Sequence, residues 1–423
     1  MKMLKWFYPG LKVKRWLILT ALGAFLSISG TSLLVGSLLP LSRQLLLEWG
    51  DRFFGPLSSP PGAAALFVMG ASAIVIGLVR AFKSIVFALA PEDGGRLVDV
   101  LYTRRYLNRG PRVVVVGGGT GLSVLLRGIK KYTSNITAIV SVADDGGSSG
   151  RLRDDLGILP PGDIRNCLVA LADKESLMEQ LLQYRFAAGE LAGHSLGNLL
   201  IAAMNDLAGG FHHAIRGMSR VLAVRGQVLP STLEKISLGA EYSDGAVVFG
   251  ESNIPSYGRR VRRVFLKPAQ CYPLPEALQA IAEADAIVLG PGSLYTSIIP
   301  NLMVTGLSDE IARSGAVKIY ICNIMTQPGE TDGYNASAHV KAIMSHAGKV
   351  VDNIVVNRGD IPRGLRDRYS KEGAAPVVAD VKEIEKMGLK AVLEPLLASG
   401  DVVRHDHDRL ARLILKLVLK NRK

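Results

Sequence analysis

Two long apolar runs without any charged residue lie within the first ninety positions. The first covers residues 16–42. The second covers residues 53–79, and its most apolar part follows a Pro-Pro-Gly break at 60–62. A membrane-spanning helix needs about 20 apolar residues at about 1.5 Å each, so both runs are long enough to cross a bilayer. We expect a transmembrane hairpin in residues 1–90, with spans at about 16–39 and 63–83.

A cleaved secretory signal and a pair of buried core helices are the alternatives to this hairpin. The apolar part of a signal usually covers about 7–15 residues, whereas the first run is longer and a second run follows it. Five basic residues precede the first run, and Arg80 and Lys83 follow the second. Because such charges are retained on the cytoplasmic side, we expect a cell-membrane protein with two spans and a cytoplasmic soluble part.

The pattern changes after residue 110, where short β-branched runs alternate with helical segments. Strands are predicted at residues 112–116, 135–142, 221–224, 246–249, 261–266, 286–289, 318–322 and 353–356. Helices are predicted at residues 121–132, 164–172, 177–184, 195–206, 211–221, 275–283 and 336–347. Several strands are continuous apolar runs, as expected when both faces are buried. The alternation predicts an α/β fold, a doubly wound and mainly parallel sheet, in residues 111–423, after a charged juxtamembrane linker at 91–110.

Charge and cysteine content narrow the class of protein. The 423 residues carry a formal charge of +13, but residues 1–90 hold nine basic and two acidic residues and so contribute +7 of it. The basicity therefore belongs largely to the anchor, and we expect no nucleic-acid partner. The three cysteines, at 167, 271 and 322, form no CxxC pair, which excludes a disulfide scaffold and a cysteine zinc site.

Two glycine-rich turns each follow a predicted strand and precede a predicted helix. The candidate ligand-binding positions in them are Gly118, Gly119, Thr120, Gly121, Gly290, Gly292 and Ser293. Glycine lets the backbone approach a phosphate closely, and the first N–H groups of a helix attract anions. The first turn is neither a full GxGxxG, because Leu122 occupies the third glycine position, nor a P-loop. Two such turns suit a nucleotide sugar, and the alternative is a pair of tight turns without a ligand.

An acidic pair, Asp144 and Asp145, ends the next predicted strand and precedes a GGSSG segment that contains Ser148. Adjacent carboxylates suit a divalent metal such as Mg²⁺, contact with sugar hydroxyls, or proton transfer. Both aspartates are therefore candidate catalytic residues and candidate metal ligands. The backbone and hydroxyl groups of the GGSSG segment suit phosphate or sugar. A solvated acidic turn is the alternative.

Further polar side chains fall near the starts of predicted helices. Asp163 is a credible N-cap, with Arg165 and Asn166 in the first turn within reach of a phosphate or sugar. Asn323 ends a predicted strand, where an amide can bind a base edge or a ribose. Capping and ligand binding remain equally open interpretations of the segment at 159–167.

Histidines occur in two further segments. Ser195 could cap the helix that follows it, which would place His194 and Asn198 near the helix N-terminus and near an anion. His405-Asp406-His407-Asp408 has the residue types of a metal site, but alternate residues of one short turn rarely form a site alone. Residues 409–423 form a basic amphipathic helix, for which packing on the domain is favoured over lying on the membrane.

Taken together, these motifs resemble the YvcK/CofD-like family, also called the gluconeogenesis factor family. The matching stretches are VVVVGGGTGLSVLLRGIK, VSVADDGGSSGRLR, LPPGDIRNCLVALA, GHSLGNLLIAAM, LGPGSLYTSIIPNL and CNIMTQPGETDGY. The resemblance implies one of two activities. YvcK-like proteins are implied to bind uridine-diphosphate sugars and to support cell shape and wall synthesis. CofD-like proteins transfer a 2-phospho-lactate group, with magnesium, to the deazaflavin precursor Fo of coenzyme F420.

The residues of these motifs resemble those of the YvcK branch more closely. We therefore expect a regulator at the cytoplasmic membrane face that binds a nucleotide sugar such as UDP-N-acetylglucosamine and requires no cofactor for binding. Mg²⁺ belongs to the alternative, a transferase of phosphorus-containing groups. Cell-wall synthesis proteins are the candidate protein partners, an oligomer is compatible with the sequence, and whether the ligand is turned over is left open.

Overall fold

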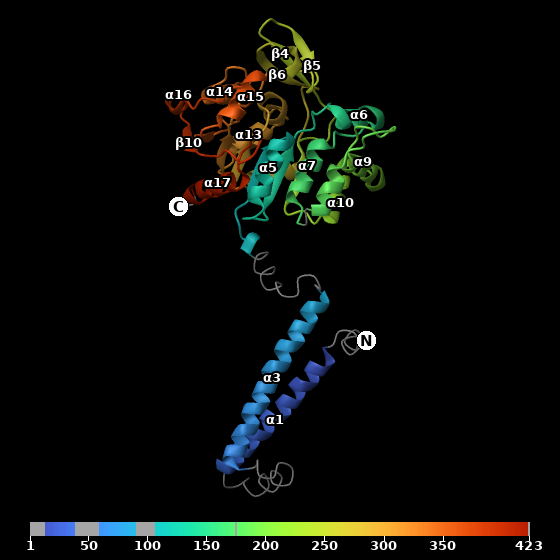
Figure 1. Cartoon of the computed structure of the whole chain (residues 1–423), viewed down its shortest axis with the longest axis vertical. Helices are drawn as coiled ribbons and strands as arrows, with labels where there is room; N and C mark the ends of the chain where they lie inside the picture. The colour runs from blue at the N-terminus through green and yellow to red at the C-terminus, as the bar shows by residue number, and fades with distance from the viewer. Residues whose placement is uncertain (1–12, 39–58, 90–105, 174–175, 422–423) are drawn as a thin grey trace. The chain divides into compact units, whose positions relative to one another are not determined.

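The structure is a computed structural model that describes residues 13–38, 59–89, 106–173 and 176–421 (Figure 1). The chain divides into two compact units, residues 1–104 and 105–423. Most of the predicted linker at 91–110 lies outside the described residues. The two units are described separately below.

The first unit contains two apolar helices, α1 (Lys14–Leu38) and α3 (Pro60–Leu89), which pack against each other. Both are long and apolar enough to cross a membrane. Small residues line their contact: a Cβ atom at Gly70 would lie 2.5 Å from the Ser27 nitrogen, and one at Gly30 would lie 2.7 Å from the Phe67 nitrogen. Such close backbone approach is typical of helix pairs in lipid. The second helix begins at Pro60, earlier than the expected start at 63, because proline is tolerated in a first helical turn.

The second unit is built on a seven-stranded parallel sheet in the order β10-β9-β8-β7-β1-β2-β3. Its strands are β1 (Val113–Gly117), β2 (Ile136–Val140), β3 (Gln227–Pro230), β7 (Ala286–Leu289), β8 (Val317–Ile321), β9 (Asn353–Asn357) and β10 (Lys390–Glu394). Every residue of β1 and β2 is buried, as their continuous apolar runs predict. Strands β2 and β3 lie on one side of β1, whereas β7, β8, β9 and β10 lie on its other side. The strand order therefore reverses between β1 and β7. The predicted α/β, mainly parallel fold is confirmed.

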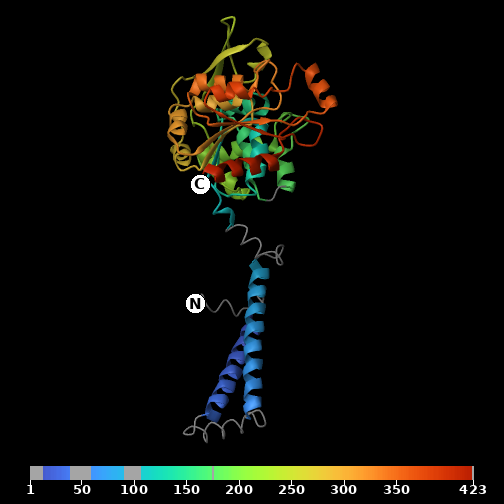
Figure 2. The ribbon, with the colours of Figure 1, turned by 90° about the vertical axis from the view of Figure 1, so that its left-hand side faces the viewer.

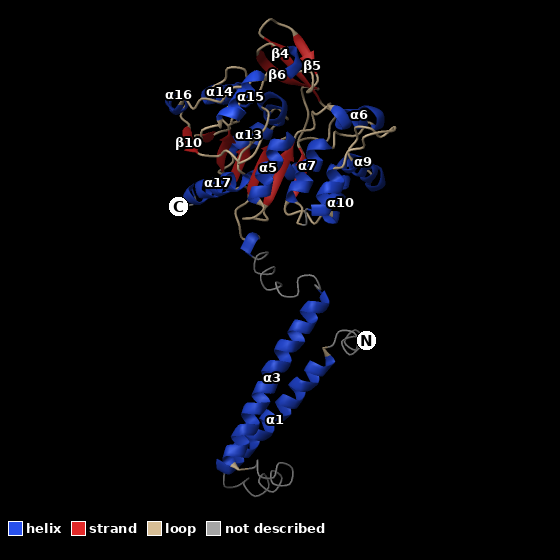
Figure 3. Cartoon of the chain, in the orientation of Figure 1, coloured by secondary structure: helices blue, strands red, loops and turns tan. Residues whose placement is uncertain are grey.

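Helices flank this sheet (Figure 3). They are α5 (Gly119–Ile129), α6 (Gly147–Leu156), α7 (Gly162–Leu171), α8 (Ser176–Gln183), α9 (Leu196–Ala208), α10 (Phe211–Val221), α11 (Pro275–Ala282), α12 (Ile299–Leu302), α13 (Leu307–Arg313), α14 (Ala336–Ala347), α15 (Arg363–Lys371), α16 (Val381–Lys386) and α17 (His407–Asn421). A π-helix, η4 (Leu294–Ile298), leads into α12, and a short 3₁₀ turn, η3 (Pro255–Tyr257), follows β5 (Val247–Phe249). All seven predicted helices are present.

Two of the predicted strands belong to a separate small sheet. Strands β4 (Ser237–Tyr242), β5 and β6 (Val261–Lys267) form an antiparallel sheet in the order β5-β4-β6. The prediction of a strand at 221–224 is wrong: Val221 is the last residue of α10, and the strand β3 starts only after Gly226. Gly226 has a φ of +87°, and this turn separates the helix from the strand. The sequence analysis also missed β4 and β10.

Candidate functional site

A cavity of about 530 Å³ opens at the carboxyl ends of β1, β7 and β8. Three loops line it, each following one of these strands: residues 118–121, 291–293 and 323–325. This is the point where the strand order reverses, and ligands of doubly wound sheets bind at such a crevice. Both glycine-rich turns and Asn323 therefore border one cavity.

The first glycine turn is shaped by two close neighbours. A Cβ atom at Gly118 would lie 2.6 Å from the Asp163 Oδ2 atom, and one at Gly121 would lie 2.6 Å from the Pro291 carbonyl oxygen. Gly119 has a φ of +69°, which favours glycine, and α5 starts there. Larger side chains at these three positions would separate the two loops or strain the backbone. Gly290, with a φ of +78°, precedes the second loop but does not line the cavity.

Asp163 lines the cavity and does not cap α7. Its Oδ2 atom accepts a 2.5 Å hydrogen bond from the backbone N–H of Gly119, so it fixes the glycine turn. The predicted N-cap role is wrong because α7 starts at Gly162, which makes Pro161 the N-cap and places Asp163 inside the first turn. Burial raises the pKa of Asp163 to about 6, against the lowering effect of the Gly119 hydrogen bond.

Asp144 and Asp145 are adjacent in the sequence but have different surroundings in the structure. Asp144 lines the cavity, and its Oδ1 atom accepts a 2.9 Å hydrogen bond from the Gly146 N–H. Asp145 does not line it; its Oδ1 atom accepts a 2.9 Å hydrogen bond from the Ser252 N–H, in the turn after β5. Asp145 therefore attaches the small sheet to this loop. Among the described residues, no three His, Cys, Asp or Glu side chains form a metal-binding group.

Five predicted site residues form a network outside the cavity lining. Asn198 Nδ2 donates to Ser148 Oγ at 3.1 Å, and Ser148 Oγ lies 3.0 Å from His194 Nδ1. Arg165 donates to Asn198 Oδ1 and to Asn166 Oδ1, both at 2.9 Å, and also bonds Ser195. Ser195 caps α9 as predicted, accepting from the Asn198 N–H. The network connects α6, α7 and α9 and gives these side chains internal partners.

Glu251 and Glu330, which the sequence analysis did not single out, lie close together at the π-helix η4. Glu251 follows β5 and lines the cavity. Glu330 is buried and accepts from the Tyr295 N–H at 3.2 Å, the Thr296 hydroxyl at 3.1 Å and Gln327 Nε2 at 2.9 Å. Burial is the main reason that the pKa of Glu251 rises to about 8 and that of Glu330 to about 7.

Hydrogen-bond partners and pKa values distinguish the two carboxyls. Glu330 accepts three donors, an arrangement suited to a carboxylate. The Thr296 O–H donates to Glu330. Glu251 has the higher pKa of the two, about 8, so at neutral pH it is the carboxyl that holds a proton.

The opposite wall comes from the C-terminal part of the chain. Residues 402–405 and Tyr369 line the cavity, and the Tyr369 hydroxyl accepts a 3.2 Å hydrogen bond from the Val403 N–H. Arg404 is the only cation among the described lining residues, which also include the carboxyls of Asp144, Asp163 and Glu251. His405 is buried, and burial lowers its pKa to about 4, so it is uncharged at neutral pH. Among the residues of this wall, the sequence analysis singled out only His405, as part of the histidine-aspartate segment.

Both apolar and polar residues line the cavity. Ile324, Met325, Tyr369 and Val403 belong to one hydrophobic cluster, which gives the cavity an apolar wall. The glycine turns, with Thr120, Ser293 and Ser297, supply polar groups. A ligand that carries both a flat ring and phosphates matches this mixed lining.

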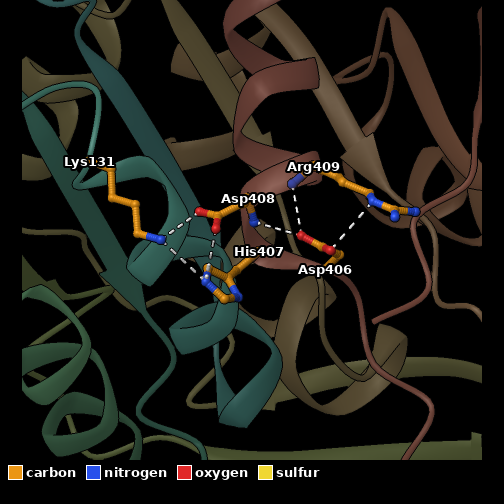
Figure 4. Close-up of polar contacts among 5 residues, drawn as sticks. All are labelled: Lys131, Asp406, His407, Asp408 and Arg409. Carbon is orange, nitrogen blue, oxygen red and sulfur yellow. Dashed lines mark hydrogen bonds and ion pairs between the residues drawn. The ribbon is translucent and has the colours of Figure 1, made fainter. Parts of the chain in front are cut away.

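The remaining candidate, the histidine-aspartate segment, caps α17 (Figure 4). Asp406 Oδ1 accepts from the Asp408 N–H at 3.0 Å and the Arg409 N–H at 2.9 Å. Asp408 pairs with Lys131 at 2.7 Å, which fastens α17 to the end of α5. The side chains serve helix capping and packing rather than a metal.

Comparison with known proteins agrees with this architecture. The family model described as 2-phospho-L-lactate transferase CofD matches residues 113–397. A putative gluconeogenesis factor of Nostoc is 47% identical over 421 residues, covering 97% of this chain and 92% of that protein. The gluconeogenesis factor of Bacillus subtilis is 54% identical over 311 residues, covering 73% of this chain and 98% of that protein.

A solved structure shares the fold of the soluble unit. It is the crystal structure of a member of the upf0052 family from Bacillus halodurans, with a TM-score of 0.70 and 52% identity, covering 72% of this chain and 99% of that one. A chain that consists almost entirely of the matched part therefore folds without an N-terminal hairpin. The chain belongs to the CofD family, among relatives named gluconeogenesis factors.

Proposed function

We propose that the soluble unit binds a nucleotide sugar, a uridine-diphosphate sugar such as UDP-N-acetylglucosamine, and acts as a regulator that supports cell shape and wall synthesis. The observation that carries this proposal is the joining of two glycine turns at one cavity that also has an apolar wall. The turns suit a diphosphate, and the apolar wall suits the base. Asn323, which also lines the cavity, suits a ribose or a base edge.

The charges of the cavity require a positive partner for the diphosphate. Three carboxyls line it against the single guanidinium of Arg404. We infer that Arg404 contacts the phosphates and that Glu251 stays protonated there. Mg²⁺ fits the same site, because this ion is commonly held by one or two carboxylates together with substrate phosphates. Asp144 is the carboxylate in the cavity that would hold it, and the ion would neutralise phosphate charge.

The apolar wall also fits a second candidate function, the transferase activity that gives the family model its description. Ile324, Met325 and Tyr369 suit a flat ring other than a nucleobase, as a phosphoryl acceptor would supply. In that case the glycine turns would bind the donor diphosphate. The N–H groups of the turns would then stabilise charge on the transferred group.

We also propose that the chain is a membrane protein with two spans and a cytoplasmic soluble unit. This proposal rests on α1 and α3, whose lengths and hydropathies suit spanning helices, and on the basic residues that flank them. Carbonate extraction of membranes from cells that express the full chain tests it. Release of the protein into the soluble fraction would contradict the anchor.

Calorimetric titration of a hairpin-free fragment, residues 91–423, tests the ligand proposal. UDP-N-acetylglucosamine and GDP are each titrated with and without Mg²⁺. Selective binding of the uridine ligand supports the regulator, whereas Mg²⁺-strengthened binding of GDP favours the transferase. Affinity for neither ligand would contradict both.

Two variants locate the binding in the cavity. Arg404→Ala should weaken binding at least tenfold, since a charge-assisted hydrogen bond contributes about 1.5–3 kcal/mol. Arg220→Ala, which removes an exposed cation from α10, is the matched control and should bind like the wild type. Asp144→Asn should abolish any effect of Mg²⁺ while leaving metal-free binding in place.

A further inference from the structure

Helix α17 presents a basic stripe to solvent. One face of the helix is buried in the domain, through Leu410, Ala411, Leu413, Ile414 and Val418. The other face carries the exposed cations Arg409, Arg412, Lys416 and Lys420, spaced three or four residues apart and therefore on one side of the helix. Residues 409–423 contain six basic residues and no acidic one. Leu419, 58% exposed, lies next to this stripe.

A shallow groove of about 260 Å³ runs beside the stripe. It is lined by Glu394, Pro395, Leu396, Arg409, Arg412, Leu413 and Lys416. Arg409 is held in place, donating to the Pro395 carbonyl at 3.2 Å and pairing with Asp406 at 3.5 Å. Among the described residues, Arg412 and Lys416 form no hydrogen bond or ion pair, although Arg412 is near enough to Asp408 to interact with its charge. Two cations in the groove are thus available to an external anion.

The stripe lies at the end of the unit where the chain enters it. Leu107 accepts a 3.0 Å hydrogen bond from the Ser134 N–H, and Lys131 of the same turn pairs with Asp408 in the first turn of α17. Figure 2 draws α17 at this end of the soluble unit. Only 16 residues, 90–105, separate α3 from Tyr106, and a fully extended chain of that length spans at most about 60 Å. The length of the connection thus limits how far Tyr106 can lie from the end of α3.

We propose that the basic stripe of α17 (Arg409, Arg412, Lys416 and Lys420) binds the anionic phospholipid headgroups of the membrane, with the groove receiving a headgroup phosphate. Charge complementarity and the short connection to the anchor favour a lipid surface as the occupant. The helix remains packed on the domain and binds through its outer face, and Leu419 adds an apolar contact at the bilayer surface. The contact would fix the orientation of the soluble unit at the bilayer. The proposal concerns a surface distinct from the nucleotide cavity.

Vesicle sedimentation of the hairpin-free fragment tests this proposal. The fragment is mixed with vesicles of phosphatidylcholine, alone or with added phosphatidylglycerol, at low and at physiological salt. We expect it to sediment only with the phosphatidylglycerol vesicles and to be released as salt rises. Each cation near an anionic surface contributes about fivefold to the binding constant, so Arg412→Ala with Lys416→Ala should weaken binding about 25-fold.

A matched pair of cations on another helix supplies the control. Arg216 and Arg220 of α10 are exposed and also four residues apart, and their replacement by alanine should leave sedimentation unchanged. Equal loss of sedimentation from both pairs of substitutions, or equal binding to uncharged vesicles, would overturn the proposal. Because the fragment lacks α1 and α3, this result does not depend on whether those helices span the membrane. Titration of the same fragment with UDP-N-acetylglucosamine separately tests the cavity.

Discussion

Replacing Glu251 by glutamine should make the soluble unit less sensitive to alkaline pH. Glutamine keeps the shape of the neutral acid and removes its ionisation. The fold raises the pKa of Glu251 from its usual 4.5 to about 8, chiefly because the side chain is buried and also because Asp144, Glu330 and Asp163 lie nearby. A carboxyl with a raised pKa contributes stability that is fully present below pH 4.5 and is lost as pH rises through 8. Wild-type stability should therefore fall between pH 6 and pH 9.

The size of the effect follows from the same values. Each tenfold change in proton affinity corresponds to 1.36 kcal/mol, so full ionisation of Glu251 would cost at most roughly 5 kcal/mol. The side chain is partly open to the cavity, and solvent reduces the cost, so we expect about 2 kcal/mol to be lost between pH 6 and pH 9. Glu330 and Asp163 are present in both proteins, so the difference between the two pH profiles reports the effect of Glu251 and of its coupling to them.

Urea unfolding of the fragment at pH 6 and pH 9 measures this difference. The stability advantage of Glu251→Gln over wild type should grow by about 2 kcal/mol between pH 6 and pH 9. Glu385→Gln, at an exposed position on α16, is the control and should follow the wild type. Parallel pH profiles for wild type and Glu251→Gln would refute the assignment of the proton to Glu251.

Three further predictions concern the loops and the helix cap. Gly121→Ala should cost about 1–3 kcal/mol in urea unfolding and weaken nucleotide binding, because its Cβ atom would meet the Pro291 carbonyl oxygen; unchanged affinity would argue against this contact. Asp145→Ala should cost about 1 kcal/mol and speed proteolysis near residues 250–253, since the Ser252 N–H loses its acceptor; an unchanged cleavage rate would count against the attachment. Asp406→Ala should cost about 1 kcal/mol, seen as a lower Tm with nucleotide affinity retained, and a loss of affinity at constant Tm would contradict a pure capping role.

Five strands of the central sheet, β1, β2, β7, β8 and β9, were predictable because they are almost entirely buried and contain runs of apolar residues. Strands β4 and β10 were missed because SLGAEY and KAVLE mix polar and apolar residues without such a run. The strand predicted at 221–224 failed for a different reason. Valine has a high preference for strands, but Val221 is the last residue of α10 and a turn lies between it and Val224.

The candidate site was predictable only where a strand leads directly into it. The glycine turns and Asn323 follow strands of the central sheet, so their position at the cavity could be inferred from the alternation alone. Glu251, Tyr369 and Arg404 come from the small sheet and from the C-terminal segments, and only tertiary packing brings them there. Asp144 and Asp145 behave differently because successive side chains of an extended segment point in opposite directions.

The soluble unit has its entrance and its cavity on opposite edges of one sheet. The segment beginning at Tyr106 enters at the amino end of β1, whereas the cavity opens at the carboxyl ends of β1, β7 and β8. A segment added ahead of Tyr106 therefore joins the sheet at the edge away from the cavity loops. The architecture thus permits gain or loss of N-terminal helices without redesign of those loops. The N-terminal helices and the cavity loops can in this way evolve as independent parts of the same chain.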